Sequence, residues 1–428
     1  MAGRTLALSS LVAVVATLVW RGKVVRNTIL PTYDLPIAYY SGGAHETQCN
    51  TIRSTPPSAM TFCEDARFWD RLDAQGAVAA RLIIIACDPG RLAWNTVMGP
   101  LANPDPRGAL WLYDPSKRHS PPRQITFEGY PEGHDFHPLG FDILPARAGQ
   151  PSTLFTTNHA RAASTIEQFA LSWDKPHVAR WVRTLESPHI VSPNAIAAVS
   201  PTSFYVTQDH YFTRRIPGIA GAVLPLAESL LGLPLGWVTH VRLLDDPASQ
   251  KVLYTVAAAG VPFANGMALS RGDGDVLAVA ATSTDEVFFY KRDPRTDALT
   301  FKERVELPFA TDNVDFDYAG TLVVAGHPHF PSLADIANNV TGKRAPSWVM
   351  SLTPITRGAA AGRRRVFDAK APVSASRKVA EPAGYDLQTL YQSNGTAFSS
   401  SSTGMVDDKT GVLYVTGLYD EGMLVCTP

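Results

Sequence analysis

The sequence lacks a long basic run, closely spaced cysteine pairs and the common catalytic signatures. Its formal net charge is −1, from 38 Lys and Arg against 39 Asp and Glu, so we expect no nucleic-acid partner. No G-x-S-x-G elbow occurs, and this absence disfavours a serine hydrolase of the α/β type. No H-E-x-x-H, P-loop or dinucleotide fingerprint is present either, so the usual signals for zincins and nucleotide-dependent enzymes are missing.

Only four cysteines occur, at positions 49, 63, 87 and 426. None is in C-x-x-C spacing, which disfavours a structural zinc site. The count is even, Cys49 precedes the first expected strands, and Cys426 lies close to the C-terminus. This pattern fits disulfides formed in an oxidising compartment. Four buried free thiols are the alternative, and the sequence leaves a pairing of Cys63 with Cys87 open.

The N-terminus carries an uncharged, mostly apolar run, Thr5–Trp20, flanked by basic residues. It is short for a membrane span but typical of a signal h-region, and no A-x-A cleavage pattern follows it. Residues 1–26 are therefore interpreted as a signal peptide or a signal-anchor, with membrane association through residues 5–20 in the second case. The basic residues that follow favour a cytoplasmic body. The cysteines and the N-x-[ST] sequons at Asn339 and Asn394 favour the secretory pathway instead, with a membrane-anchored or secreted product.

The rest of the chain is dominated by short β-type runs, with 45% hydrophobic and 18% charged residues overall. Each run has five to eight residues, is rich in Val, Tyr, Phe and Thr, and ends at Gly, Pro, Asp or Asn. The runs span residues 82–87, 109–114, 152–159, 165–171, 203–209, 251–258, 276–282, 286–290, 321–326 and 411–417. Two pairs of runs, 152–159 with 165–171 and 276–282 with 286–290, read as hairpins.

Segments outside these runs are expected to be peripheral. Residues 27–60 read as a loose lead-in, and residues 357–385 as a surface insertion. Residues 225–241 are apolar at helix-like spacing, although Gly232, Pro234 and Gly236 would break a helix. A packed helix is the commoner outcome of such a pattern, and an apolar lid or membrane-touching insert is the alternative.

Serial hairpins without alternating helices exclude a parallel α/β fold. They favour an all-β fold, a β-propeller over residues 61–428 that follows an N-terminal hydrophobic helix, because radial repetition protects strand edges. Propellers commonly close by joining their two chain ends, and a bridge between Cys49 and Cys426 would do so covalently.

Acidic and amide side chains precede several of the apolar runs. They are Glu64-Asp65, Asn194, Asn265 and Asp312-Asn313. In a propeller, such positions from different blades point into one central channel. Three amides with two or three carboxylates supply about six hard oxygens, within the range that calcium takes. Independent turn residues are the alternative interpretation, because Asp and Asn also begin turns.

Several long motifs, in order along the chain, resemble the paraoxonase/arylesterase family. They are TTNHARAASTIEQFAL, VSPNAIAAVSPTSFYVTQDHYF, VPFANGMALSRGDGDVLAVA and LPFATDNVDFDYAGTLVVAGHP, with CED near the start and GVLYVTGLYDEGMLVC at the end. The similarity runs from about Cys49 to Cys426. It implies a six-bladed propeller with two central calcium ions and activity on lactones and aryl esters. A disulfide between the chain ends and a retained hydrophobic N-terminus are further family traits.

The resemblance also implies roles for individual residues. The catalytic calcium would be held by Glu64, Asn194, Asn265, Asp312 and Asn313, all of the family's ligand types. Calcium would polarise the substrate carbonyl and stabilise the oxyanion, with water as nucleophile. Phe263 matches an aromatic residue of the substrate pocket, and His327 falls in a G-x-H-P-like wall motif. His210 matches a D-H-Y-F motif that packs beside the channel.

The chain departs from the family at the base histidine. The family's F-N-P-H-G-type motif reads Phe136-His137-Pro138-Leu139-Gly140 here, so Leu139 stands where the histidine is expected. The usual partner histidine is present as His159. In an extended loop His137 would share a face with Leu139, so His137 or His134 is a candidate substitute base. Ordinary polar loop histidines are the alternative, and Asp312 is a further candidate for activating water.

A second departure is Ala195, where the family has an aspartate that binds the buried structural calcium. Asp65 keeps one ligand of that ion, but Ala195 removes another. The sequence therefore predicts one calcium ion and a second site that is weakened, rebuilt or empty.

These features favour a calcium-dependent hydrolase of small-molecule lactones or aryl esters. A calcium-stabilised binding propeller that lost catalysis with the base histidine is the second interpretation. A strictosidine-synthase-like propeller is the third, and the retained calcium ligands disfavour it.

Overall fold

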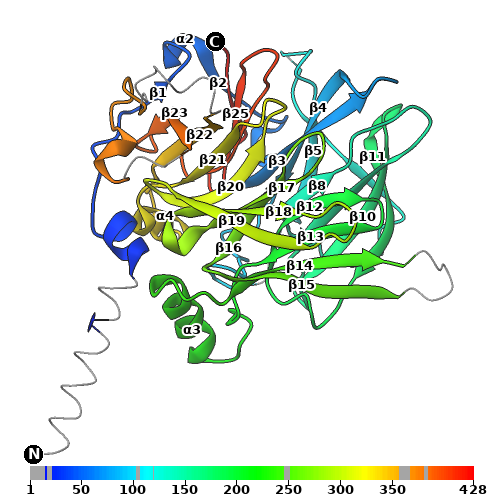
Figure 1. Cartoon of the computed structure of the whole chain (residues 1–428), viewed down its shortest axis with the longest axis horizontal. Helices are drawn as coiled ribbons and strands as arrows, with labels where there is room; N and C mark the ends of the chain where they lie inside the picture. Colours follow the sequence, from blue (N-terminus) through cyan, green and yellow to red (C-terminus); the bar gives the residue numbers. More distant parts are fainter. Residues whose placement is uncertain are drawn as a thin grey trace, which may run out of the picture.

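Six β-sheets of four or five strands form the body of the protein in a computed structural model (Figure 1). The structure describes residues 15–16, 22–102, 107–118, 120–244, 251–355, 367–379 and 384–428. Most of the N-terminal run 5–20 and much of the proposed insertion 357–385 lie outside the described residues. Within the described part, no helix is long and apolar enough to cross a membrane.

Four sheets are built from strands that are consecutive in the chain, apart from one added edge strand. The first contains β3 (Cys63–Leu72), β4 (Val78–Cys87), β5 (Ala109–Tyr113) and β6 (Arg123–Gln124). The second contains β8 (Pro138–Ile143), β9 (Ser152–Asn158), β10 (Thr165–Ser172) and β11 (Lys175–Leu185), with β7 (Thr126–Glu128) parallel to β11. The third contains β12 (Pro193–Ser200), β13 (Ser203–Gln208), β14 (Gly236–Leu243) and β15 (Val252–Val261). The fourth contains β16 (Ala264–Leu269), β17 (Val276–Ala281), β18 (Glu286–Arg292) and β19 (Leu299–Glu306).

The remaining two sheets combine C-terminal strands with a strand from the N-terminal lead-in. The fifth contains β20 (Ala310–Phe316), β21 (Leu322–His327), β22 (Ser347–Pro354) and β23 (Tyr385–Ser393), with β1 (Tyr39–Tyr40) at its edge. The sixth contains β24 (Ser401–Val406), β25 (Leu413–Gly417) and β26 (Met423–Cys426), with β2 (Cys49–Ile52) at its edge. The lead-in thus supplies the outer edge of two blades.

The first strands of the six sheets form a closed ring. These strands, which we call the inner strands, are β3, β8, β12, β16, β20 and β24, and each contacts the next around the ring. Six buried apolar clusters fill the spaces between neighbouring sheets. For example, Trp69 of the first sheet and Phe141 of the second share one cluster. The predicted six-bladed propeller is confirmed, and so are the two predicted hairpins, as β9–β10 and β17–β18.

The chain ends close the ring by pairing within one sheet. Strand β2 runs antiparallel to β26, with Cys49 opposite Cys426, and the two cysteines form a disulfide. Figure 1 shows the C-terminus beside β2. Cys63 and Cys87 form a second disulfide between β3 and β4. The described chain contains no free cysteine, so the free-thiol alternative is wrong.

Helices are few and lie outside the sheets. They are η1 (Val25–Ile29), α2 (His45–Gln48), η2 (Pro57–Ala59), α3 (Ile219–Leu230), η3 (Thr282–Thr284), α4 (Phe330–Ala337) and η4 (Ala375–Arg377). Helix α3 ends before Gly232, and residues 236–241 belong to strand β14. The helix expected over residues 225–241 is therefore correct only in its first turns. Pairing with β13 and β15 outweighs the apolar spacing beyond Gly232.

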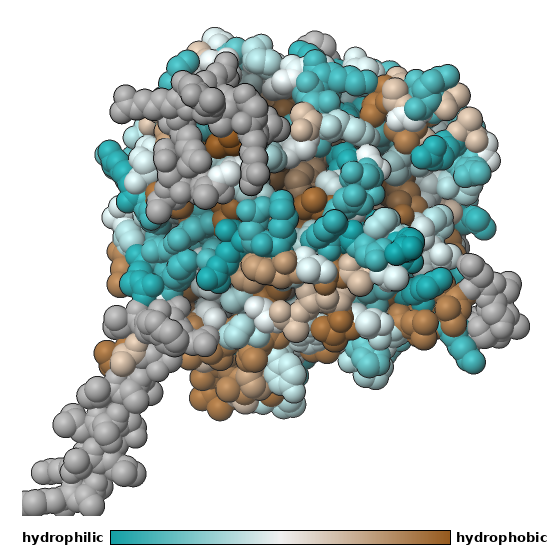
Figure 2. Space-filling model, in the orientation of Figure 1, coloured by the Kyte–Doolittle hydropathy of each residue, from teal (hydrophilic) through white to brown (hydrophobic). Residues whose placement is uncertain are grey.

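One face of α3 is apolar and exposed. Ile219, Val223 and Leu226 are 82%, 52% and 50% exposed, and they lie on one side of the helix. Figure 2 shows the apolar side chains gathered over α3 at the lower left of the molecule. A cavity that also contacts Phe263 is lined by Ala222, Pro225, Ser229 and Leu230 of α3, with Leu226 at its edge.

Candidate metal centre

The predicted oxygen ligands converge at one end of the central channel. Glu64 lies on β3, Asn194 on β12, Asn265 on β16, and Asp312 and Asn313 on β20. Each is the second to fourth residue of an inner strand, and each side chain is at least 94% buried. Four of the six blades therefore contribute to one site.

Irregular strand pairing explains why these side chains face the channel. Each inner strand shifts its register against the second strand of its sheet where a site residue lies, for example between Cys63 and Asp65 and between Thr311 and Val314. The same shift occurs on β8, β12, β16 and β24. A bulge places an extra residue in the strand and re-aims its side chain. The bulges of the inner strands therefore direct polar side chains into the central channel.

Glycine allows the inner strands to approach closely at the site. A Cβ atom on Gly266 would lie 2.4 Å from the Cα atom of Asn313, and one on Gly140 would lie 2.5 Å from the carbonyl oxygen of Asn194. Only a residue without a side chain fits at such contacts. Phe263, directly before β16, has a φ of 55°, a left-handed conformation that a large side chain rarely adopts.

Four oxygens in the site are buried and have no hydrogen-bond partner. They are Glu64 Oε2, Asn194 Oδ1, Asn265 Oδ1 and Asn313 Oδ1. Leaving a buried oxygen unsatisfied costs about 1–3 kcal/mol, and native proteins contain few such groups. Four of them in one place, all acceptors, indicate that a cation completes the site.

The amide nitrogens of the same residues are already bonded, which fixes the direction of each carbonyl oxygen. Asn194 donates to Asp209 Oδ2 at 3.2 Å, and Asn265 donates to Thr282 Oγ1 at 3.1 Å. Asn313 donates to Glu64 Oε1 at 2.8 Å. Because each amide nitrogen already has an acceptor, the carbonyl oxygens are the groups left to face the centre.

Electrostatics in the site also favour a bound cation. Burial raises the pKa of Glu64 well above its usual value, and the neighbouring carboxylates of Asp65 and Asp312 raise it further. Burial likewise raises the pKa of Asp65 to about 6. Carboxylates crowded in a dry site repel one another, and a bound cation removes that repulsion.

The donor set fits calcium and not zinc. Within the described residues, no three His, Cys, Asp or Glu side chains cluster as a metal site. The centre therefore depends on amide oxygens together with two carboxylates. Calcium accepts such all-oxygen sets, whereas zinc prefers nitrogen and sulfur. The residues present fit a calcium ion, which they would hold between β3, β12, β16 and β20.

The second, inner position expected from the family does not fit a metal ion in the same way. Asp65 Oδ1 accepts hydrogen bonds from the Ala66 amide at 2.8 Å and from Thr403 Oγ1 at 3.0 Å. Asp65 Oδ2 accepts from the Phe141 amide at 3.2 Å and lies 3.4 Å from the Arg67 guanidinium. Both carboxylate oxygens are thus occupied, and Ala195 offers no ligand from its side chain.

A small cavity of about 40 Å³ opens directly onto the centre. It is lined by metal-centre residues, by Leu139, Phe263, His327 and Arg91, and by apolar residues such as Met98 and Phe330. A larger and mostly apolar cavity of about 410 Å³ shares Val97, Met98, Phe263 and Phe330 with it and extends under α3 and α4. The apolar cavity therefore adjoins the small cavity of the metal centre at these shared residues.

His327 is the histidine that the structure brings to the centre. Its Nε2 lies 2.8 Å from Asp312 Oδ2, and its Nδ1 is buried without a partner. Both side chains line the small cavity. This pair has the geometry of an oriented base, in which a carboxylate fixes the tautomer and leaves the other ring nitrogen free.

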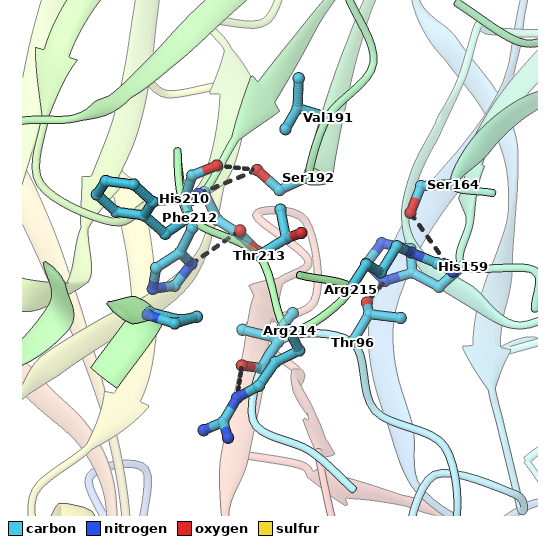
Figure 3. Close-up of a pocket in the computed structure, with 13 residues that line it drawn as sticks. Thr96, His159, Ser164, Val191, Ser192, His210, Phe212, Thr213, Arg214 and Arg215 are labelled. Atoms are coloured by element: carbon cyan, nitrogen blue, oxygen red, sulfur yellow. Dashed lines mark hydrogen bonds and ion pairs between the residues drawn. The ribbon is translucent and has the colours of Figure 1, made fainter. Parts of the chain in front are cut away.

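The other candidate histidines lie away from the metal centre. His137 is held by Asp88, with Nδ1 3.0 Å from Oδ2, and His134 by Glu167, with Nε2 3.0 Å from Oε1. His159 Nε2 donates to the carbonyl oxygen of Pro193 at 2.6 Å, and its Nδ1 contacts the Thr96 hydroxyl. Figure 3 shows His159 beside Thr96 and Arg215, in a side pocket. None of the three lines the small cavity, whereas Leu139 does.

His210 connects the centre to α3. Its Nδ1 lies 2.9 Å from Asp209 Oδ1, and its Nε2 lies 2.7 Å from Ser229 Oγ on α3. Its ring packs against Phe263 with centroids 4.4 Å apart. Since Asp209 also accepts from Asn194, a hydrogen-bonded chain runs from a metal-centre amide to the helix. Figure 3 shows His210 beside Ser192 in this part of the site.

Two arginines near the site were not anticipated from the sequence. Arg91 lines the small cavity, and its Nε is buried without a partner. Arg67 lies on β3 beside Asp65. A basic residue between acids in an otherwise apolar strand, as in CEDARFW, is the signal that could have marked Arg67.

The model of the arylesterase family matches residues 97–359, more than half of the chain. The chain belongs to the arylesterase family. Its relatives include serum paraoxonase/lactonase 3 of Homo sapiens, 26% identical over 227 residues. Serum paraoxonase/arylesterase 1 of Mus musculus is 27% identical over 231 residues. Each match covers 53% of this chain and 59% of the relative, so the chain spans less than two thirds of either relative.

Solved structures of low identity also align along most of this arylesterase-family chain. A gluconolactonase from Xanthomonas campestris aligns with a TM-score of 0.41 and 14% identity, covering 93% of this chain and 99% of that one. A luciferin-regenerating enzyme aligns with the same TM-score and identity, covering 92% and 95%.

Proposed function

We propose that this protein is a calcium-dependent hydrolase of lactones or aryl esters. The observation that carries the proposal is the set of four orphaned, buried oxygens on Glu64, Asn194, Asn265 and Asn313. A calcium ion bound there would act as a Lewis acid on the substrate carbonyl and stabilise the developing oxyanion. The names of the paraoxonase, lactonase and arylesterase relatives support the same class of reaction.

The protein's own residues would handle the proton of the attacking water. In this proposal His327 Nδ1 takes that proton, and Asp312 holds the ring through Nε2 and stabilises the imidazolium that results. Leu139 cannot act as a base, so it serves only as an apolar wall of the cavity. His159 then has a positioning role, because it holds the Pro193 carbonyl next to Asn194.

The apolar cavity under α3 and α4 suits a hydrophobic part of the substrate. Its lining is mostly apolar and includes Met98, Leu226, Phe263 and Phe330. An ester or lactone carbonyl at the centre would leave its apolar substituent in this cavity.

Two formed disulfides support passage through an oxidising compartment. Both sequon asparagines, Asn339 and Asn394, are exposed and therefore accessible to glycosylation. We place the protein in the secretory pathway on these grounds.

The test of the proposed function is calcium removal, with a matched pair of amide variants. Chelation should abolish turnover of a simple lactone and of phenyl acetate, and added calcium should restore it. Asn265→Ala should lower turnover by roughly 100-fold or more and lose the calcium ion. Asn50→Ala, which removes an exposed amide far from the channel, should change neither. Turnover that fully resists chelators would contradict the proposal.

A calcium-stabilised binding propeller is the second candidate, and Leu139 in the cavity favours it. In that case calcium would still raise the melting temperature. A broad panel of lactones and esters would then show no rate above that of the Asn265→Ala variant.

A further inference from the structure

A single arginine ties three inner strands together below the metal centre. Arg67 donates from Nε to the Phe141 carbonyl at 3.2 Å, from Nη1 to the Val314 carbonyl at 3.0 Å, and from Nη2 to the Met267 carbonyl at 3.3 Å. These carbonyls belong to β8, β20 and β16. Because Arg67 itself lies on β3, its guanidinium bridges four of the six blades.

Two carboxylates compensate the charge of this guanidinium. Asp65 Oδ2 lies 3.4 Å from Nη2, and Asp315 Oδ1 lies 3.5 Å from Nη1. The Arg67 side chain is only 4% exposed. A buried guanidinium stays protonated and needs such partners, so the position holds a permanent positive charge.

The oxygens that contact Arg67 are the kinds that calcium binds in proteins. They comprise backbone carbonyls from several strands and carboxylates, all converging on one point of the channel axis. A divalent ion placed among them would compete with the guanidinium for the same oxygens and be repelled by its charge. Ala195, on the neighbouring β12, contributes no side-chain oxygen to this point.

Arg67 lines one of two cavities at opposite ends of the inner strands. The small cavity of the metal centre lies at the starts of the inner strands. A polar cavity of about 580 Å³, lined by Arg67, Asp142, Asp315 and Arg271, opens at their other ends.

We propose that the Arg67 guanidinium occupies the inner cation position of this propeller, so that the protein binds a single calcium ion, at the outer centre. Unlike a bound ion, the covalently attached guanidinium cannot dissociate from the inner strands that it bridges. The claim that one calcium ion binds at the outer centre rests on the proposed function. The assignment of the inner position to Arg67 stands on its own contacts.

Calcium stoichiometry tests this directly in the full-length protein. After gel filtration in buffer with micromolar calcium, elemental analysis should find about one calcium ion per chain, and Asn265→Ala should hold none. About two ions in the wild type with one left in Asn265→Ala would overturn the inference. No ion in either protein would agree with an inner position free of metal but would contradict the proposed calcium function.

A variant series tests whether the position is truly a cation site. Arg67→Met removes the charge but keeps much of the side-chain volume, and it should lower the melting temperature by several degrees in chelator. Adding Asp at the neighbouring position, in the double variant Arg67→Met with Ala195→Asp, should create a second calcium site, with about two ions per chain.

Arg271→Met is the matched control. Arg271 also donates to Asp315, at 3.1 Å, but the one backbone carbonyl to which it donates is that of Phe316, at 2.9 Å. It should gain no calcium. If the double variant folds and still binds no additional calcium, the inference is wrong. If it does not fold, the wild-type stoichiometry decides.

Discussion

At the residue scale, a hydrogen bond to Asp312 favours His327 as the base that we propose in place of the expected histidine. His327 is fixed by Asp312 and keeps a free Nδ1 on the cavity wall. His137 and His134 each have one ring nitrogen hydrogen-bonded to a carboxylate outside the cavity. The metal centre therefore has one histidine with an available lone pair among the described residues that line it.

Replacing this histidine should separate catalysis from metal binding. His327→Gln should lower kcat for a lactone by roughly 100-fold, since general-base catalysis contributes about that much. The calcium content should stay unchanged, because the five oxygen ligands remain. Asp312→Asn is the comparison variant and should lose both activity and calcium affinity. Equal kcat values for His327→Gln and wild type would refute the assignment of the base.

His159 should make stability depend on pH. Burial lowers the pKa of His159 to about 4, whereas an unfolded histidine has a pKa near 6.5. Between these values the unfolded chain binds a proton that the folded chain does not, so the free energy of unfolding falls as pH drops from about 6.5 to 4. The loss is at most about 1.4 kcal/mol per pH unit.

Urea unfolding of His159→Gln across this pH window measures the effect. The variant should show a shallower decline in stability than the wild type. His177→Gln, at an exposed position, should keep the wild-type slope. Parallel curves for all three proteins would show that His159 is not the titrating group.

At the element scale, a buried carboxylate of helix α3 anchors the helix to the loop that follows β13. Glu228 is 2% exposed, and it accepts hydrogen bonds from the amides of Tyr211 and Phe212 at 2.9 and 3.0 Å. These contacts fix the loop after β13, which carries His210, to the helix that covers the apolar cavity.

We expect the variant Glu228→Ala to weaken the attachment of α3 over the apolar cavity. Removing the two partly buried hydrogen bonds should cost about 1 kcal/mol each in stability, and KM for hydrophobic esters should rise more than kcat falls. Glu228→Gln keeps one carbonyl acceptor, so its stability and its KM should lie between those of the wild type and those of Glu228→Ala. Thermal unfolding and steady-state kinetics report the two effects separately. A Glu228→Ala variant with wild-type KM would show that α3 does not shape substrate binding.

At the scale of the whole molecule, the ring is held by a covalent bond between its ends. The Cys49–Cys426 disulfide encloses 377 residues, whereas Cys63–Cys87 encloses 24. A cross-link reduces the entropy of the unfolded chain more when its loop is longer.

Removing the two disulfides separately should reveal this difference. In the chain-entropy model, Cys49→Ala with Cys426→Ala should lose about 2 kcal/mol more stability than Cys63→Ala with Cys87→Ala. Equilibrium urea denaturation measures both. A larger loss for the shorter loop would show that local strain or packing at Cys63, and not ring closure, dominates.

The sequence by itself indicated the blade pattern, the chain-end cysteines and the residues that we propose as metal ligands. Short apolar runs bounded by turn residues predict strands from local sequence, and each ligand motif lies within a single run. Both can therefore be recognised without knowledge of tertiary contacts. Sequence also showed that Leu139 replaces a histidine. It placed a helix over residues 225–241, where local apolar spacing gave way to strand pairing in β14.

Only the tertiary structure decided which charged groups meet in the channel. Alternation along an extended segment suggested that His137 shares a face with Leu139, but β8 begins at Pro138 and its register shifts between Pro138 and Phe141. Arg67 donates to carbonyls that lie 74 to 247 residues away along the chain. His327 pairs with Asp312, only 15 residues away, but the cavity that both side chains line is formed by residues from distant strands. No local pattern encodes such contacts, because the bulges and the closure of the ring set them together.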